Sequence, residues 1–123
     1  MKGNPVGWFE IYVQDMARAR AFYETVLGCK IEALPGVELE MYAFPMDDKT
    51  YGASGALVHF AGMPSGGNST LVYFQSEDCG ATAARVVPAG GKIAREKMSI
   101  GKYGFIALAL DPDGNMIGLH SMQ

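Results

Sequence analysis

The feature that most constrains the fold of this chain is an internal repeat. Residues 28–31 (Gly-Cys-Lys-Ile) resemble residues 90–93 (Gly-Gly-Lys-Ile). Each string follows a stretch of helix-like spacing that begins after an aspartate, Asp15 in the first half and Asp78 in the second. Repetition of this kind, at an interval of about 62–63 residues, indicates two copies of one structural unit.

The first copy shows the clearest local signals. Phe9, Ile11 and Val13 alternate with other side chains at the period of a strand. Asp15 is a good N-cap for the helical stretch that follows, and Gly28 supplies its C-terminal stop. After this helix, strands are predicted at 29–34, 38–45 and 53–61.

The second copy repeats this order with a weaker helix. The first strand of each copy is predicted at 6–13 and 69–76, and the last strands of the second at 92–97, 103–110 and 115–121. The second helix is predicted from Asp78 to about residue 88, although Gly80 and Pro88 weaken it. Asp111-Pro112-Asp113-Gly114 predicts a turn. We expect a single domain, 1–123, made of two βαβββ modules at about 5–61 and 69–122.

Composition excludes several classes of protein. The 123 residues are 49% hydrophobic and 19% charged, which excludes a disordered segment. The net charge is −3 and no basic run occurs, so we expect no nucleic-acid partner. No run approaches 18 apolar residues, and no leader-like segment is found. We therefore expect no membrane association and a cytoplasmic location. Cys29 and Cys79 match no metal-ligand spacing and are expected to be buried thiols.

Three residue strings resemble the vicinal oxygen chelate superfamily, which groups glyoxalases, bleomycin-resistance proteins and extradiol dioxygenases. They are Val13-x-Asp15 with Arg20-Ala21-Phe22-Tyr23 and Leu27-Gly28, then residues 89–93, then residues 111–117. The chain also ends in Ile-Gly-Leu-His-Ser at 117–121, as a glyoxalase-like subgroup does. The resemblance implies an α+β fold in which duplicated βαβββ modules form a curled, mostly antiparallel eight-stranded sheet around a cavity, with helices outside. It also implies a homodimer and a small-molecule ligand.

The resemblance implies metal ligands on the first and last strand of each module, and this sequence departs from it there. The corresponding positions hold Trp8, Leu71 and Gly118, with the fourth near Gly55. None of these side chains binds a divalent ion. We therefore expect no metal cofactor of the glyoxalase type.

Glu10 and His120 lie two residues beyond these positions. A shift of two residues keeps a side chain on the same face of a strand, about 6.6–6.8 Å further along. Both are candidate catalytic groups and, if one divalent ion binds after all, its candidate ligands. The alternative interpretations are that Glu10 is a solvated carboxylate on an exposed sheet face and that His120 is an ordinary hydrogen-bonded histidine at the end of a strand. The candidate ligand-binding residues on this face are Trp8, Tyr12, Leu71, Tyr73 and Gly118. Tyr42 is an aromatic side chain that we also expect on this face.

Three functions fit these residues. The first is a metal-free protein that binds a small, partly aromatic or apolar molecule. The second is a lyase or isomerase of the glyoxalase type with a displaced metal site. The third is a metal-free enzyme in which Glu10 and His120 move a proton. The sequence leaves the choice between binding and catalysis open.

Overall fold

The computed structural model describes residues 3–67, 70–110, 112 and 114–123, and only the backbone of Val26. The chain divides into two compact units. The first unit is Trp8–Thr70, and the second is Leu71–Gln123 together with the N-terminal segment that ends at Gly7. The N-terminal segment therefore belongs to the unit that is distant in sequence, and Gln75 N donates to Pro5 O at 2.9 Å.

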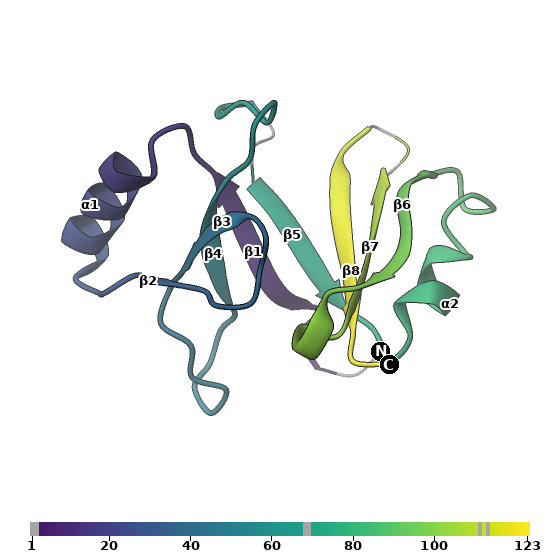
Figure 1. The fold of residues 1–123 in the computed structure, drawn as a ribbon. Coiled ribbons are helices and arrows are strands. Elements are labelled where there is room, and N and C mark those ends of the chain that lie inside the picture. The colour runs from purple at the N-terminus through teal and green to yellow at the C-terminus, as the bar shows by residue number, and fades with distance from the viewer. Residues whose placement is uncertain (1–2, 68–69, 111, 113) are drawn as a thin grey trace. The chain divides into compact units, whose positions relative to one another are not determined.

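The first unit carries one helix and one sheet (Figure 1). Its elements are β1 (Val6–Tyr12, which begins in the N-terminal segment), α1 (Met16–Leu27), β2 (Glu32–Ala33), β3 (Glu40–Ala43) and β4 (Ser54–His59). The strands follow the order β2-β3-β4-β1. Strands β1 and β4 are parallel, whereas β3 pairs with β2 and with β4 in antiparallel fashion.

Local signals place α1 as predicted. The Asp15 carboxylate accepts a hydrogen bond from Arg18 N at 3.1 Å, which satisfies one free donor of the first turn. Gly28 ends the helix in the left-handed conformation, with φ 65°. A buried cluster of Val13, Met16, Ile31, Phe44 and Leu57 includes the first residue of α1 and a residue of β4.

The second unit repeats this plan. Its elements are β5 (Thr70–Gln75, of which Thr70 is the last residue of the first unit), α2 (Cys79–Ala83), β6 (Lys92–Ser99), a 3-10 turn (Gly101–Tyr103), β7 (Phe105–Leu110) and β8 (Met116–Ser121). Its strand order is β5-β8-β7-β6, with β5 parallel to β8 and the remaining pairs antiparallel. Its core cluster is Cys79, Ala83, Ala107 and Leu119.

The fold class is confirmed, and the length of the second helix differs from expectation. The described residues form eight strands and two α-helices in two βαβββ units, with a mixed sheet because β1 and β4, and β5 and β8, run parallel. The prediction of a helix as far as residue 88 is wrong. Helix α2 ends at Ala83, and Arg85 N and Val86 N bond three residues back, as in tight turns. Pro88 disfavours helical geometry at Val87, so no helix is formed as far as residue 88.

Strand boundaries also differ. The strands predicted at 29–34 and 38–45 are shorter in the structure, as β2 and β3. The predicted strand at 92–97 extends to Ser99 instead. Ser69, at the start of a predicted strand, and Asp111 and Asp113, in the predicted turn, lie outside the described residues.

Candidate functional site

Strand β1 presents two chemically different faces. Phe9 and Ile11 pack against the buried cluster that contains Val13 and Met16. Because side chains alternate along a strand, Trp8, Glu10 and Tyr12 lie on the opposite face. Period-two spacing thus brings an indole, a carboxylate and a phenol together from five consecutive residues.

The Glu10 carboxylate is the centre of this group. Glu10 is buried, with 8% of its surface exposed. The Tyr12 hydroxyl donates to Oε1 at 2.9 Å, and the Trp8 indole N–H donates to Oε2 at 3.2 Å. Burial raises the pKa of the Glu10 carboxyl above its usual value of 4.5, because a charged group loses hydration there. The hydrogen bonds from Tyr12 and Trp8 lower that pKa in part.

His120 has a different environment in the second unit. Its Nε2 lies 2.6 Å from the carbonyl oxygen of Tyr103, which follows Gly101 and Lys102 in the 3-10 turn. A carbonyl can only accept, so Nε2 carries the proton and Nδ1 of the neutral ring is an acceptor. Gly104 has φ 104°, and a Cβ there would lie 2.4 Å from Ser121 O and 3.3 Å from Nε2. Glycine is therefore required for the turn to approach β8.

Tyr73 and Gly118 are packed together in the same unit. They are register partners in the parallel β5–β8 pair, as are Gln75 and His120. A Cβ on Gly118 would lie 2.4 Å from Tyr73 Cδ2, so the aromatic ring occupies the space that a side chain at 118 would need. Tyr73 and Leu71 are both buried.

The structure brings together some of the predicted site residues and not others. Glu10 contacts Trp8 and Tyr12, and Tyr73 covers Gly118. The predicted pairing of Glu10 with His120 joins two different units and stays a prediction.

Two assignments made from the sequence are wrong. Gly55 is the register partner of Phe9, and a Cβ on it would lie 2.7 Å from the Phe9 ring, so it belongs to the face that packs on the core. Ala56 instead pairs with Glu10. Tyr42 also lies on the core side, since it packs against the cluster that contains Leu57.

Sequence reasoning missed two residues of these sites. Ala56 could be identified only from the strand register, because the repeat interval predicts its position only to within one residue. Tyr103 binds His120 through a backbone atom, which no side-chain pattern reveals. Gly101, which begins this turn, and Gly104, which follows it, are the sequence signal that could have identified the turn.

The donor set does not fit a glyoxalase-type metal ion. With Ala56 in place of Gly55, the four positions hold indole, alkyl and glycine groups, none of which is a ligand for a divalent ion. Within the described part of the chain, no group of three His, Cys, Asp or Glu side chains could hold a metal ion.

A depression with a volume of about 770 Å³ lies elsewhere in the first unit. It is lined by the end of α1, β2 and the end of β3, and includes Cys29, Lys30, Phe44 and Met46. It contains none of the predicted site residues. Among the described residues, no helix is long and apolar enough to cross a membrane.

Comparison with known proteins supplies the family. The model of the Glyoxalase/Bleomycin resistance protein/Dioxygenase superfamily matches residues 6–119. The anthracycline biosynthesis protein DauV of Streptomyces sp. (strain C5) is 29% identical over 120 residues, which cover 89% of this chain and 38% of DauV. CFP32 of Mycobacterium bovis, whose name includes the word glyoxylase, is 32% identical over 108 residues, which cover 87% of this chain and 40% of CFP32. The chain thus spans about two fifths of the length of both relatives.

Solved structures share the fold at low sequence identity. Methylmalonyl-CoA epimerase from Mycobacterium tuberculosis has a TM-score of 0.68 at 16% identity, over 97% of this chain and 88% of that one. The hypothetical protein BH1468 from Bacillus halodurans C-125 has a TM-score of 0.71 at 13% identity, over 99% of this chain and 96% of that one. At these identities the likeness concerns the fold alone.

Proposed function

The chain belongs to the Glyoxalase/Bleomycin resistance protein/Dioxygenase superfamily, and from that premise we propose that it binds a small, partly aromatic or apolar molecule without the metal ion of the glyoxalase type. The observation that carries the proposal is the group formed by Trp8, Glu10 and Tyr12. Two aromatic donors hold one buried carboxylate in a fixed orientation. Binding sites for small molecules are mostly apolar with a few such fixed polar groups.

The residues at the metal-ligand positions support a metal-free site. A divalent ion needs three or four side chains with nitrogen, oxygen or sulfur donors. Trp8, Ala56, Leu71 and Gly118 supply none, and Tyr73 fills the space beside Gly118. A ligand held by shape and by a few hydrogen bonds places no such demand on these positions.

The named relatives suggest two chemical classes of ligand to test first. The name of DauV refers to anthracyclines, which are planar polycyclic molecules. The name of CFP32 includes the word glyoxylase, so the adduct of a 2-oxoaldehyde with a thiol, on which an enzyme of the glyoxalase type acts, is the second class to test. Trp8 is the single tryptophan of the chain, so its fluorescence reports directly on ligands that bind near Glu10.

The first experiment combines metal analysis with binding. The purified protein is analysed for metals as isolated, and again after stripping and reloading with Zn, Ni, Mn and Fe. We expect far fewer than one tightly held ion per chain and saturable quenching of Trp8 fluorescence by a planar ligand. One tightly held ion per chain that Glu10→Gln or His120→Ala releases would overturn the proposal, and would favour a lyase or isomerase with a displaced metal site.

A second candidate function is metal-free proton transfer by Glu10. The raised pKa of this buried carboxyl favours it, because a general acid or base works best when its pKa approaches the working pH. Turnover of the hemithioacetal of methylglyoxal and glutathione by the metal-stripped protein, abolished in Glu10→Gln, would establish this function. We also propose a homodimer in the cytoplasm, which light scattering and cell fractionation would test.

A further inference from the structure

We propose that the ligand presents a positively charged amine to Glu10, next to a planar ring system that lies against Trp8. This inference rests on the proposed binding function and names the chemical class of its ligand. It follows from the charge, the hydrogen-bonding capacity and the aromatic neighbours of one carboxylate.

Among the described residues of the first unit, the charge of Glu10 has no counterion. Its hydrogen-bond donors, Trp8 and Tyr12, are both neutral. The ion pairs of the first unit involve other acids, namely Arg20–Glu24 and Lys30–Glu32, and the His59 ring lies beside Glu40. A buried carboxylate is normally paired with a cation, because an uncompensated charge in a poorly hydrated place is unfavourable. A cationic ligand would supply the missing partner.

The carboxylate also retains acceptor capacity. A carboxylate offers about four lone-pair positions, and each oxygen of Glu10 accepts one hydrogen bond from Tyr12 or Trp8. Either oxygen can therefore accept a further hydrogen bond in addition to the one it already accepts. A protonated amine carries several N–H donors and forms charge-assisted hydrogen bonds, which are stronger than neutral ones.

Trp8 adds a preference for a flat cation. The indole N–H is fixed on Glu10 Oε2, so the orientation of the ring is determined by this bond. An indole is the best of the aromatic side chains for attracting a cation over its face, and it stacks with other planar rings. One ligand with an amine and an aromatic ring therefore satisfies both neighbours at once.

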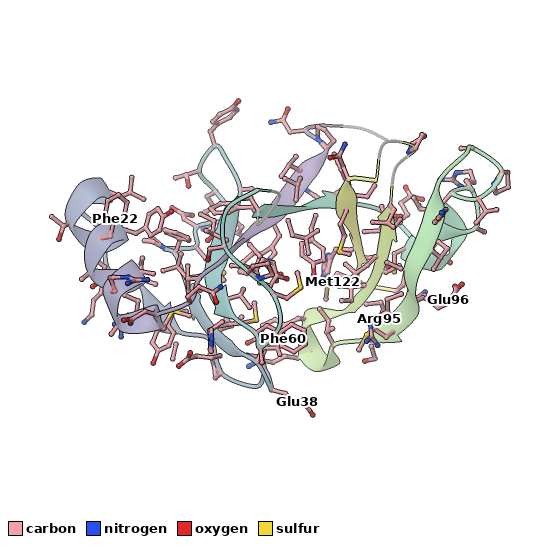
Figure 2. The ribbon with its side chains drawn as sticks, turned by 90° about the horizontal axis from the view of Figure 1, so that it is seen from above. Phe22, Glu38, Phe60, Arg95, Glu96 and Met122 are labelled. Atoms are coloured by element: carbon pink, nitrogen blue, oxygen red, sulfur yellow. The ribbon has the colours of Figure 1, made fainter. Side chains whose placement is uncertain are left out.

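The test uses two pairs of probes in which a protonated amine is compared with a neutral group on the same ring system. Daunorubicin carries an amine that is protonated at neutral pH, and its N-acetyl derivative is neutral. A smaller pair, 2-naphthylmethylamine and 2-naphthylmethanol, is used as well, in case daunorubicin is too large to reach Glu10. Binding to the full chain is measured by isothermal titration calorimetry for the wild type, Glu10→Gln and Glu38→Gln. The last is a matched control, because it removes the same charge from an exposed side chain of the first unit (Figure 2).

We expect the charged member of at least one pair to bind the wild type about 10- to 100-fold more tightly than the neutral member, the range for a hydrogen bond to a buried charge. Glu10→Gln should abolish this preference by weakening the binding of the charged probe while leaving that of the neutral probe unchanged. Glu38→Gln should keep the preference. Tyr12→Phe removes a donor that lowers the pKa of Glu10, so the pH above which the charged probe is preferred should rise in this variant. This measurement covers the case in which Glu10→Gln does not fold, and an unchanged pH dependence would then contradict the role of Glu10.

Three results would overturn the inference. Equal affinities of both members for the wild type would remove the role of charge and leave the proposed binding function standing. A preference that persists in Glu10→Gln would assign the charge recognition to another group. Absence of saturable binding by either pair would exclude planar cations as the ligand class. The proposed function is tested separately, since one tightly held metal ion per chain would overturn it.

Discussion

Replacing Tyr12 with phenylalanine tests whether the hydroxyl of Tyr12 stabilises the charged form of Glu10. The substitution removes the 2.9 Å hydrogen bond to Oε1 and keeps the aromatic ring. A hydrogen bond to a charged group contributes about 1.5–3 kcal/mol to stability, and a bond between neutral groups about 0.5–1.5 kcal/mol. The loss of stability should therefore be about 1 kcal/mol larger when Glu10 is ionised than when it is protonated.

The sign of the pH dependence follows from the raised pKa of Glu10. Because its folded-state pKa lies above the usual 4.5, the stability that the protonated group contributes is complete below pH 4.5 and is lost as the pH rises through the folded-state pKa. Tyr12→Phe removes a donor that lowers this pKa, so the folded-state pKa rises further. The stability of the variant should then fall more steeply with pH than that of the wild type.

Urea unfolding followed by the fluorescence of Trp8, at a series of pH values from 4 to 8, measures this effect. Tyr51→Phe is the matched control, since Tyr51 is 95% exposed and its hydroxyl should contribute little at any pH. An equal loss of stability for Tyr12→Phe at pH 4 and pH 8 would refute the reasoning. It would mean that the hydroxyl does not distinguish the carboxylate from the carboxylic acid.

Two other predictions concern the second unit. Gly118→Ala should lower the free energy of unfolding by about 1–3 kcal/mol, the range for overpacking, because its Cβ would lie 2.4 Å from the Tyr73 ring. When Tyr73→Ala is also present, Gly118→Ala should cause no further loss of stability. Unfolding of Gly118→Ala in urea at the wild-type midpoint would contradict this account of the packing. Lys97→Met should lower the urea midpoint at pH 7, because Lys97 donates to Asp78 at 2.8 Å and this bond lowers the pKa of Asp78. A lowered pKa contributes stability that is lost as the pH falls below the usual 3.8, so wild type and variant should converge in acid, and a constant difference between them would exclude this origin.

Signals that act within a few residues were readable from the sequence. Asp15 and Gly28 fixed both ends of α1, because N-caps and left-handed C-caps depend on local backbone geometry. The alternation along β1 placed Glu10 between Trp8 and Tyr12, because side chains two residues apart share a face. The repeat, which compares one half of the chain with the other, gave the order of the elements.

Contacts between distant segments were decided by tertiary structure. The register of β4 against β1 places Ala56, and not Gly55, beside Glu10, and a shift of one residue reverses the face of every side chain. The repeat interval is uncertain by one residue, so the sequence alone cannot decide between Gly55 and Ala56. The bond between His120 and the Tyr103 carbonyl likewise requires a turn that approaches β8 at Gly104. Such contacts depend on how separate strands and turns pack, and composition and spacing do not encode that in a readable form.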